Sequence, residues 1–154
     1  MSEHMKKLKV YLDNCCLNRP FDDLSNDIVR LESEAILTII DRCEKGYWDF
    51  SSSDVLFDEI SRLADNVKKQ KILLLCQSAS LNIELTEEII ARAKELERFG
   101  VKSYDALHAA SAEYGNADVF LTTDHRLINA LNRAKVKIKV ENPLVWLVEV
   151  LHER

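Results

Sequence analysis

The sequence predicts one α/β domain over residues 1–154, a three-layer α/β/α sandwich around a mostly parallel five-stranded sheet. Two observations lead to this fold class. Strand-like and helix-like segments alternate along the chain, and no repeat, low-complexity tract or linker-like break interrupts them. Because parallel strands need crossover connections, which are usually helices, this alternation predicts a sheet that is covered on both faces.

Five short segments have the composition of strands, rich in β-branched, aromatic and other apolar residues. The first of them ends at Asp13, and a polar turn is expected from there to Pro20. The five segments are LKVYL (8–12), YWDFS (47–51), LNIEL (81–85), ADVFLT (117–122) and VKIKV (136–140).

Apolar residues recur every three or four positions between these segments, which predicts helices. One helix is expected between Thr86 as its N-cap and Gly100 as its C-cap, and an alanine-rich one over Ser103–Tyr114. A final helix follows Pro143. The apolar repeats in the first half of the chain are Ile28, Leu31, Ala35 and Ile39, and then Leu56, Ile60, Leu63 and Val67.

The composition, 47% hydrophobic and 31% charged, is that of a folded globular domain. No apolar run approaches the roughly 18 residues of a membrane span. The N-terminal MSEHMKKLKV has no apolar core of a signal peptide, so a cytoplasmic protein is expected. The four cysteines form no CxxC pair, which favours reduced thiols over a zinc site. The net charge of −5 argues against a protein that binds nucleic acid through bulk charge.

Four acidic residues stand where chemistry is expected in such a sheet. Asp13 follows the first strand and Asp124 follows the fourth, and ligands bind beyond the carboxyl ends of parallel strands. Glu59 lies near the start of the helix after the second strand, and Asp105 lies in the first turn of the alanine-rich helix. Helical geometry places Glu59 on the flank of the apolar face and Asp58 on the opposite, solvent side.

Each acid taken singly also has a purely structural explanation. Asp105 and Glu59 are suited to complement the positive end of a helix dipole. Asp124 is suited to cap the helix that starts near His125, and Asp13 is suited to hold the turn before Pro20. A shared site is therefore argued from the set of four and not from any member.

The order LKVYLDNCCLN, SSSDVLFDEISRL, SYDALHAASAEYGNADVFLTTDHRL resembles a PIN domain, the nuclease fold that includes VapC-type toxins. The resemblance covers essentially the whole chain, and its third block is the most specific part. It implies one metal site with four catalytic, metal-binding acids. A small polar residue near the last acid and one after the first are expected to support them. The implied acids are Asp13, Glu59, Asp105 and Asp124, with Asn14 and either Thr122 or Thr123 in support.

The implied chemistry agrees with simple electrostatics. Two carboxylates about 5 Å apart repel by roughly 3 kcal/mol at an effective dielectric near 20, so four in one cleft need a cation. Mg²⁺ or Mn²⁺ suits oxygen ligands. The resemblance implies cleavage of RNA that leaves a 5′-phosphate, an antitoxin partner if the chain is a toxin, and a homodimer. Arg19 is a candidate substrate contact, because it shares a turn with the site.

Two other readings compete with a ribonuclease. A PIN-like fold kept as a nucleic-acid-binding or protein-interaction module would need no catalysis, although retention of all four acids argues against it. A haloacid-dehalogenase-like phosphatase needs a second Asp two residues after the first, and Cys15 stands there. The turn from Asn14 to Pro20 departs from the Ser- or Thr-rich turn of the toxins, which leaves the substrate and the biological role open.

Overall fold

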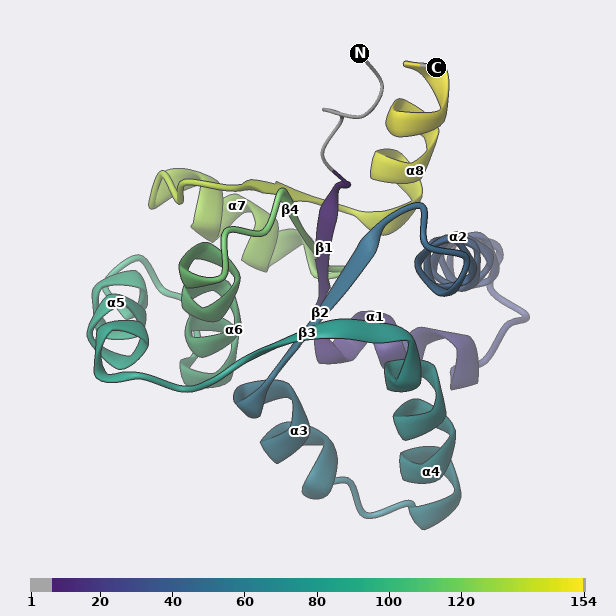
Figure 1. Cartoon of the computed structure of the whole chain (residues 1–154), viewed down its shortest axis with the longest axis horizontal. Coiled ribbons are helices and arrows are strands. Elements are labelled where there is room, and N and C mark those ends of the chain that lie inside the picture. Colours follow the sequence, from purple (N-terminus) through teal and green to yellow (C-terminus); the bar gives the residue numbers. More distant parts are fainter. Residues whose placement is uncertain (1–6, 154) are drawn as a thin grey trace.

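The structure is a computed structural model that describes residues 7–153. A five-stranded sheet runs through its middle, with helices on both sides (Figure 1). The strand order is β3-β2-β1-β4-β5, and all four strand pairings are parallel. The predicted α/β fold around a parallel sheet is thereby confirmed. The strands are β1 (Lys9–Leu12), β2 (Asp49–Ser53), β3 (Ala79–Ile83), β4 (Val119–Leu121) and β5 (Lys139–Glu141).

The helices begin where the sequence offers capping groups. Thr86 accepts a hydrogen bond from the backbone N–H of Ile89, as expected of an N-cap, and Pro143 stands in the first turn of the last helix. The α-helices are α1 (Asn14–Asn18), α2 (Asp27–Glu44), α3 (Asp54–Ser61), α4 (Asn66–Leu75), α5 (Glu87–Glu97), α6 (Ser103–Tyr114), α7 (His125–Arg133) and α8 (Pro143–His152). Two short 3₁₀ turns, η2 (Arg19–Phe21) and η3 (Cys76–Ser78), join them.

Two apolar cores lie on opposite faces of the sheet, because side chains alternate along each strand. Val10 and Leu12 of β1 belong to one core, and Tyr11 belongs to the other. Helices α1, α2, α4 and α8 contribute to the first core, and α5, α6 and α7 cover the other face (Figure 1). The molecule is therefore the three-layer sandwich that the sequence predicts.

Two details of the sequence prediction are wrong. The apolar repeat that reaches Val67 does not form one helix, because α3 ends at Ser61 and Asp65 caps a new helix, α4, by accepting from the N–H of Lys68. Val67 is 66% exposed. The expected polar turn before Pro20 is instead helical, as α1 and η2.

None of the helices described in residues 7–153 has the length and apolar character needed to span a bilayer. Residues 1–6, which carry most of the segment inspected for a signal peptide, lie outside the described residues.

A buried polar brace ties the end of the chain to α2 and to η2. Glu32 of α2 is 3% exposed and accepts a hydrogen bond from Nδ2 of Asn142 at 2.7 Å. Its other oxygen lies 3.0 Å from Nε of Arg19. Asn142 also caps α8 by accepting from the N–H groups of Leu144 and Val145. The brace fixes η2, and with it the turn that follows β1.

We predict that Asn142→Ala destabilises the protein by about 2–3 kcal/mol, because it removes a helix cap and leaves the buried carboxylate of Glu32 short of a donor. Denaturant unfolding measures the change. The matched control is Asn26→Ala, which removes the exposed cap of α2 and is expected to cost about 1 kcal/mol. Equal losses in the two variants would contradict a role of Asn142 beyond capping.

Candidate metal centre

A cavity of about 350 Å³ opens where β1 and β4 end, and all four predicted acids line it. The chain proceeds outward from β1 through β2 and β3 in one direction and through β4 and β5 in the other, so β1 and β4 flank the point where the strand order reverses. Such a switch point leaves a crevice at the carboxyl ends of the strands. The four lining acids are Asp13, Glu59, Asp105 and Asp124.

Two of the acids are also helix N-caps. Asp13 follows β1, is 3% exposed, and accepts at Oδ1 from the N–H of Cys16 at 3.0 Å. Asp124 follows β4 and accepts at Oδ1 from the N–H groups of Arg126 and Leu127. Both aspartates are thus helix caps, as their structural explanation predicts, and both also line the cavity. The caps hold the two carboxylates at the cavity wall.

The other two acids reach the cavity from helices. Asp105 lies in the first turn of α6. Glu59 is in the second half of α3, not near its start, so the expectation that it complements the positive end of that helix is wrong. Glu59 is partly buried and lines the cavity, whereas its neighbour Asp58 is exposed and pairs with Arg62.

Charge accumulates in this cavity. Burial, and after it the charges of Asp13, Asp124 and Glu59, raise the pKa of Asp105 to about 6. Burial likewise raises the pKa of Asp13 well above its ordinary range. Arg19 lines the cavity, but it is held 3.2 Å from Asp22 and 3.0 Å from Glu32. The carboxylates therefore share a space in which negative charge is poorly compensated.

The supporting polar residues divide into two groups. Asn14 and Thr123 line the cavity, and Oδ1 of Asn14 accepts from the side chain of Asn18 at 3.0 Å. Thr122 is fully buried and accepts from the backbone N–H of Asp124 at 3.1 Å. Thr123 is thus the one of the two threonines that borders the cavity, and Thr122 braces the turn behind it.

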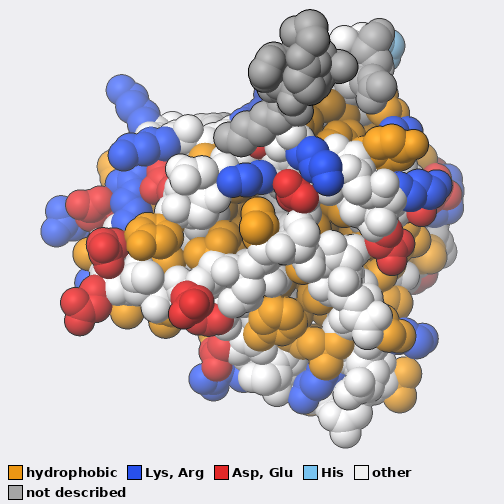
Figure 2. All heavy atoms as spheres, in the orientation of Figure 1, with side chains coloured by type: hydrophobic (Ala, Val, Ile, Leu, Met, Phe, Trp, Pro, Cys, Tyr) orange, Lys and Arg blue, Asp and Glu red, His pale blue; other side chains and the backbone are white. Residues whose placement is uncertain are grey.

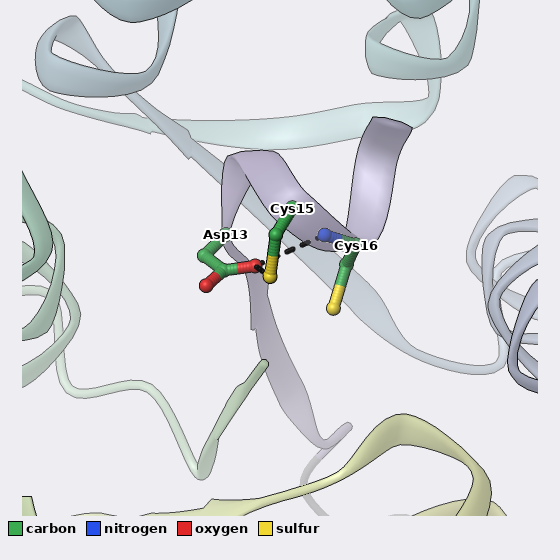
Figure 3. A group of neighbouring side chains, drawn as sticks. All are labelled: Asp13, Cys15 and Cys16. Atoms are coloured by element: carbon green, nitrogen blue, oxygen red, sulfur yellow. Dashed lines mark hydrogen bonds between the residues drawn. The ribbon is translucent and has the colours of Figure 1, made fainter. Parts of the chain in front are cut away.

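Cys15 takes a place that the sequence analysis did not foresee. Its sulfur lies 2.8 Å from Oδ1 of Asp13, and Figure 3 shows the two side chains directed at one another while the Cys16 thiol points away. Within residues 7–153, the group of potential metal-ligand atoms found within 4.8 Å of one another is that of Asp13, Cys15 and Cys16. All four cysteines are free thiols, as the sequence predicts.

Further residues in the cavity wall were not among the predicted site residues. Asp22 adds a fifth carboxylate beside Arg19, Leu63 adds an apolar wall, and His108 contacts Glu59 at 2.7 Å. The spacing of His108 three residues after Asp105 was a usable signal, since such residues share a helix face. No sequence signal indicated Asp22, because its position depends on the ion pairs around Arg19.

A second cavity, of about 570 Å³, adjoins the first and shares Asp105, Thr123 and Asp124 with it. Lys102 and Arg126 also line this second cavity. The acidic centre therefore continues into a region that carries basic side chains.

Comparisons with known proteins agree with this geometry. The model of the PIN domain family matches residues 26–132, a stretch that includes Glu59, Asp105 and Asp124 but not Asp13. A comparison with curated proteins gives no match.

Three solved structures share the fold. VapBC2 from Rickettsia felis, bound to a DNA fragment from its promoter, is 16% identical with a TM-score of 0.57, over 88% of this chain and 98% of that one. A protein from Pyrobaculum aerophilum is 17% identical with a TM-score of 0.56, over 92% of this chain and 90% of that one. VapBC-1 from nontypeable Haemophilus influenzae is 14% identical with a TM-score of 0.55, over 88% of this chain and 98% of that one.

The fold and the site together define a class: a parallel α/β protein with an acidic cavity at its switch point. Since the family model matches more than half of the chain, the protein belongs to the PIN domain family, whose members are generally nucleases.

We predict that Asp105→Asn stabilises the metal-free protein at neutral pH. The folded-state pKa of about 6 lies above the 3.8 of an unperturbed aspartate, so the unfolded chain loses its proton first. Stability therefore falls as the pH rises from about 4 to above 6. Removing the charge of this partly exposed group should raise the free energy of unfolding by about 1 kcal/mol at pH 7.5, which corresponds to a melting temperature about 2–4 °C higher. At pH 4 the melting temperature should change little.

Thermal unfolding with EDTA present measures this difference, and Asp58→Asn, at an exposed position, is the control. A variant that melts below wild type at pH 7.5 would contradict the electrostatic cost of Asp105.

We also predict that iodoacetamide modifies Cys15 before the other cysteines. Hydrogen bonding with Cys16 first, and then with Asp13 and the two threonines, lowers the pKa of Cys15 to about 6. Burial raises the pKa values of Cys43 and Cys76 to about 12. At pH 7 the labelling rates should differ by about tenfold or more, since the thiolate is the nucleophile. Peptide mass spectrometry measures them, and equal labelling of Cys43 or Cys76 would contradict the assignment.

Proposed function

We propose that this protein is a divalent-cation-dependent ribonuclease that hydrolyses RNA phosphodiester bonds. One observation carries the proposal: four acids from separate parts of the chain line one cavity. Burial, and after it the charges of the other three acids, raise the pKa of Asp105 there to about 6. Structural carboxylates are usually spaced or paired with cations, so such an arrangement is typical of a site that binds a cation.

The donor set fits Mg²⁺ or Mn²⁺. Carboxylate oxygens are hard ligands, and a divalent ion removes the repulsion that raises the pKa of Asp105. Cys15 adds a softer donor beside Asp13, which suits Mn²⁺ better than Mg²⁺.

Each acid has a role in the proposed reaction. Asp13 and Asp124, held in place as helix caps, are the primary ligands. Glu59 and Asp105 hold a second ion or orient the attacking water. When bound, the cation polarises the phosphodiester, lowers the pKa of that water and stabilises the leaving oxygen. The lining of one cavity by all four acids, each carried by a helix or by a cap that follows a strand, supports these roles.

The adjoining cavity supports a path for the RNA backbone. Lys102 and Arg126 line it, beyond Asp105 and Asp124, where they suit phosphates on either side of the scissile bond. On the described part of the face in Figure 2, acidic and basic side chains are interspersed without one broad basic field. Substrate binding therefore depends on local charges and the bound cation, and not on the net charge of −5. Arg19, tied to Glu32, serves mainly to shape the near wall.

The biological setting we propose is that of a cytoplasmic toxin paired with an antitoxin protein, acting as a homodimer. Two of the structures that share the fold carry the name VapBC. The name supports the proposal of a protein partner for this chain.

We predict that Asp13→Asn lowers the rate of RNA cleavage with Mg²⁺ or Mn²⁺ by about 10²-fold or more, because it removes a ligand of the cation that activates water. The variant keeps the cap of α1 through its side-chain oxygen. Gel analysis of a fluorescent single-stranded RNA measures the rate, with EDTA as the metal-free reference.

Asp58→Asn is the matched control, one acid beside Glu59 that does not line the cavity, and should cleave like wild type. Undiminished cleavage by a folded Asp13→Asn variant would refute the assigned site. RNA binding without metal-dependent cleavage by wild type would favour a binding module instead.

A further inference from the structure

A buried chain of hydrogen bonds runs from the cavity into the protein interior, beginning at Glu59. Nε2 of His108 lies 2.7 Å from Oε1 of Glu59, and Nδ1 of the same ring lies 2.7 Å from the hydroxyl of Tyr11. That hydroxyl lies 2.6 Å from Oγ of Ser53. His108 is 1% exposed, and Tyr11 and Ser53 are not exposed at all. The chain is therefore isolated from solvent except at its Glu59 end, where 26% of the side chain is exposed.

Both ring nitrogens of His108 are engaged in this chain. Nε2 faces Glu59, whose carboxylate oxygen is suited to accept its N–H. Nδ1 is held by the Tyr11 hydroxyl, which is held in turn by Oγ of Ser53. Oγ of Ser53 also accepts from the backbone N–H of Leu56. The orientation of the His108 ring is therefore fixed at both nitrogens.

The residues of this hydrogen-bond chain belong to the elements that carry the acids of the cavity. Ser53 is the N-cap of α3, and α3 carries Glu59. Tyr11 lies on β1, two residues before Asp13, and His108 lies on α6, one turn after Asp105. The chain therefore connects the three elements that bring Glu59, Asp13 and Asp105 to the cavity. The Tyr11 ring is itself held by stacking on the ring of Phe120 of β4, with 5.5 Å between the ring centroids.

We propose that His108, with its ring held by Tyr11 and Ser53, is a positioning residue that holds the Glu59 carboxylate at the cation site. A glutamate has three rotatable side-chain bonds, and a partly exposed one samples several rotamers unless a partner fixes it. A buried N–H donor leaves one carboxylate oxygen engaged and the other directed to the cavity. This inference rests on the proposed cation site and assigns His108 no contact with substrate.

The test is Tyr11→Phe, which keeps the aromatic ring in the core and removes only the hydroxyl. Nδ1 of His108 then loses its partner, so the ring is no longer held in one orientation toward Glu59. Residues that support metal ligands typically affect metal affinity by 10–100-fold, so Mn²⁺ affinity should fall by about that factor. Isothermal titration of the metal-free full chain with Mn²⁺ measures affinity without reference to cleavage.

Three further variants separate positioning from simple stability. His108→Leu removes the donor to Glu59 and should weaken Mn²⁺ binding as Tyr11→Phe does. His108→Gln offers an amide N–H near the place of Nε2 and should recover most of the affinity. Tyr114→Phe, at the far end of α6 and 50% exposed, is the matched control and should bind like wild type. Circular dichroism and thermal unfolding establish that each variant is folded at the temperature of titration.

The outcomes distinguish this inference from the proposed function. If wild type does not bind Mn²⁺, the cation site itself is wrong, and the positioning role is overturned with it. If wild type binds and a folded Tyr11→Phe variant binds equally tightly, the cation site stands and the positioning role is overturned. Should His108→Leu fail to fold, Tyr11→Phe and His108→Gln decide alone. Equal affinity losses in His108→Gln and His108→Leu would likewise overturn it.

Discussion

Repulsion between carboxylates in one confined space is the interaction on which the rest of this structure depends. Asp105 shows it most directly, since its pKa rises to about 6 through burial and three neighbouring acids. Groups that repel one another separate unless the surrounding structure prevents it. The parallel sheet prevents it here, because β1 and β4 are hydrogen-bonded neighbours that deliver Asp13 and Asp124 to the same edge. The sheet thus holds an arrangement that its charges oppose.

Much of the polar interior supports that arrangement. Caps hold Asp13 and Asp124, the chain through His108 reaches Glu59, and the brace at Glu32 fixes the turn after β1. Each uses backbone N–H groups or buried side chains, which have few alternative conformations once the two cores are packed. The proposed function and the folding therefore share residues, so we expect a substitution at one of them to change both. This is common where a site is strained by its own charges.

The sequence was informative where periodicity and strand ends decide position. Alternating elements gave the parallel sheet, and acids directly after strands, such as Asp13 and Asp124, could be placed because parallel strands end at one edge. The sequence analysis failed where position depends on local rotamers and caps, which apolar periodicity does not reveal. The contact of Cys15 with Asp13 is set by the rotamers in α1, which had been expected to be a turn. The break between α3 and α4 depends on the cap Asp65, which outweighed a continuous apolar repeat.

The caps at Asp13 and Asp124 have a consequence for the size of ion that the cavity suits. In both residues Oδ1 accepts the backbone N–H groups of the helix that follows, so Oδ2 is the oxygen that each has left to offer a ligand. In the proposed cation site, each aspartate would then offer one atom and not a two-oxygen clamp. Single-oxygen ligands suit the compact octahedron of Mg²⁺ or Mn²⁺, whereas Ca²⁺ takes six to eight oxygens and often both from one carboxylate. The two helix starts thus favour the smaller ions in the proposed site.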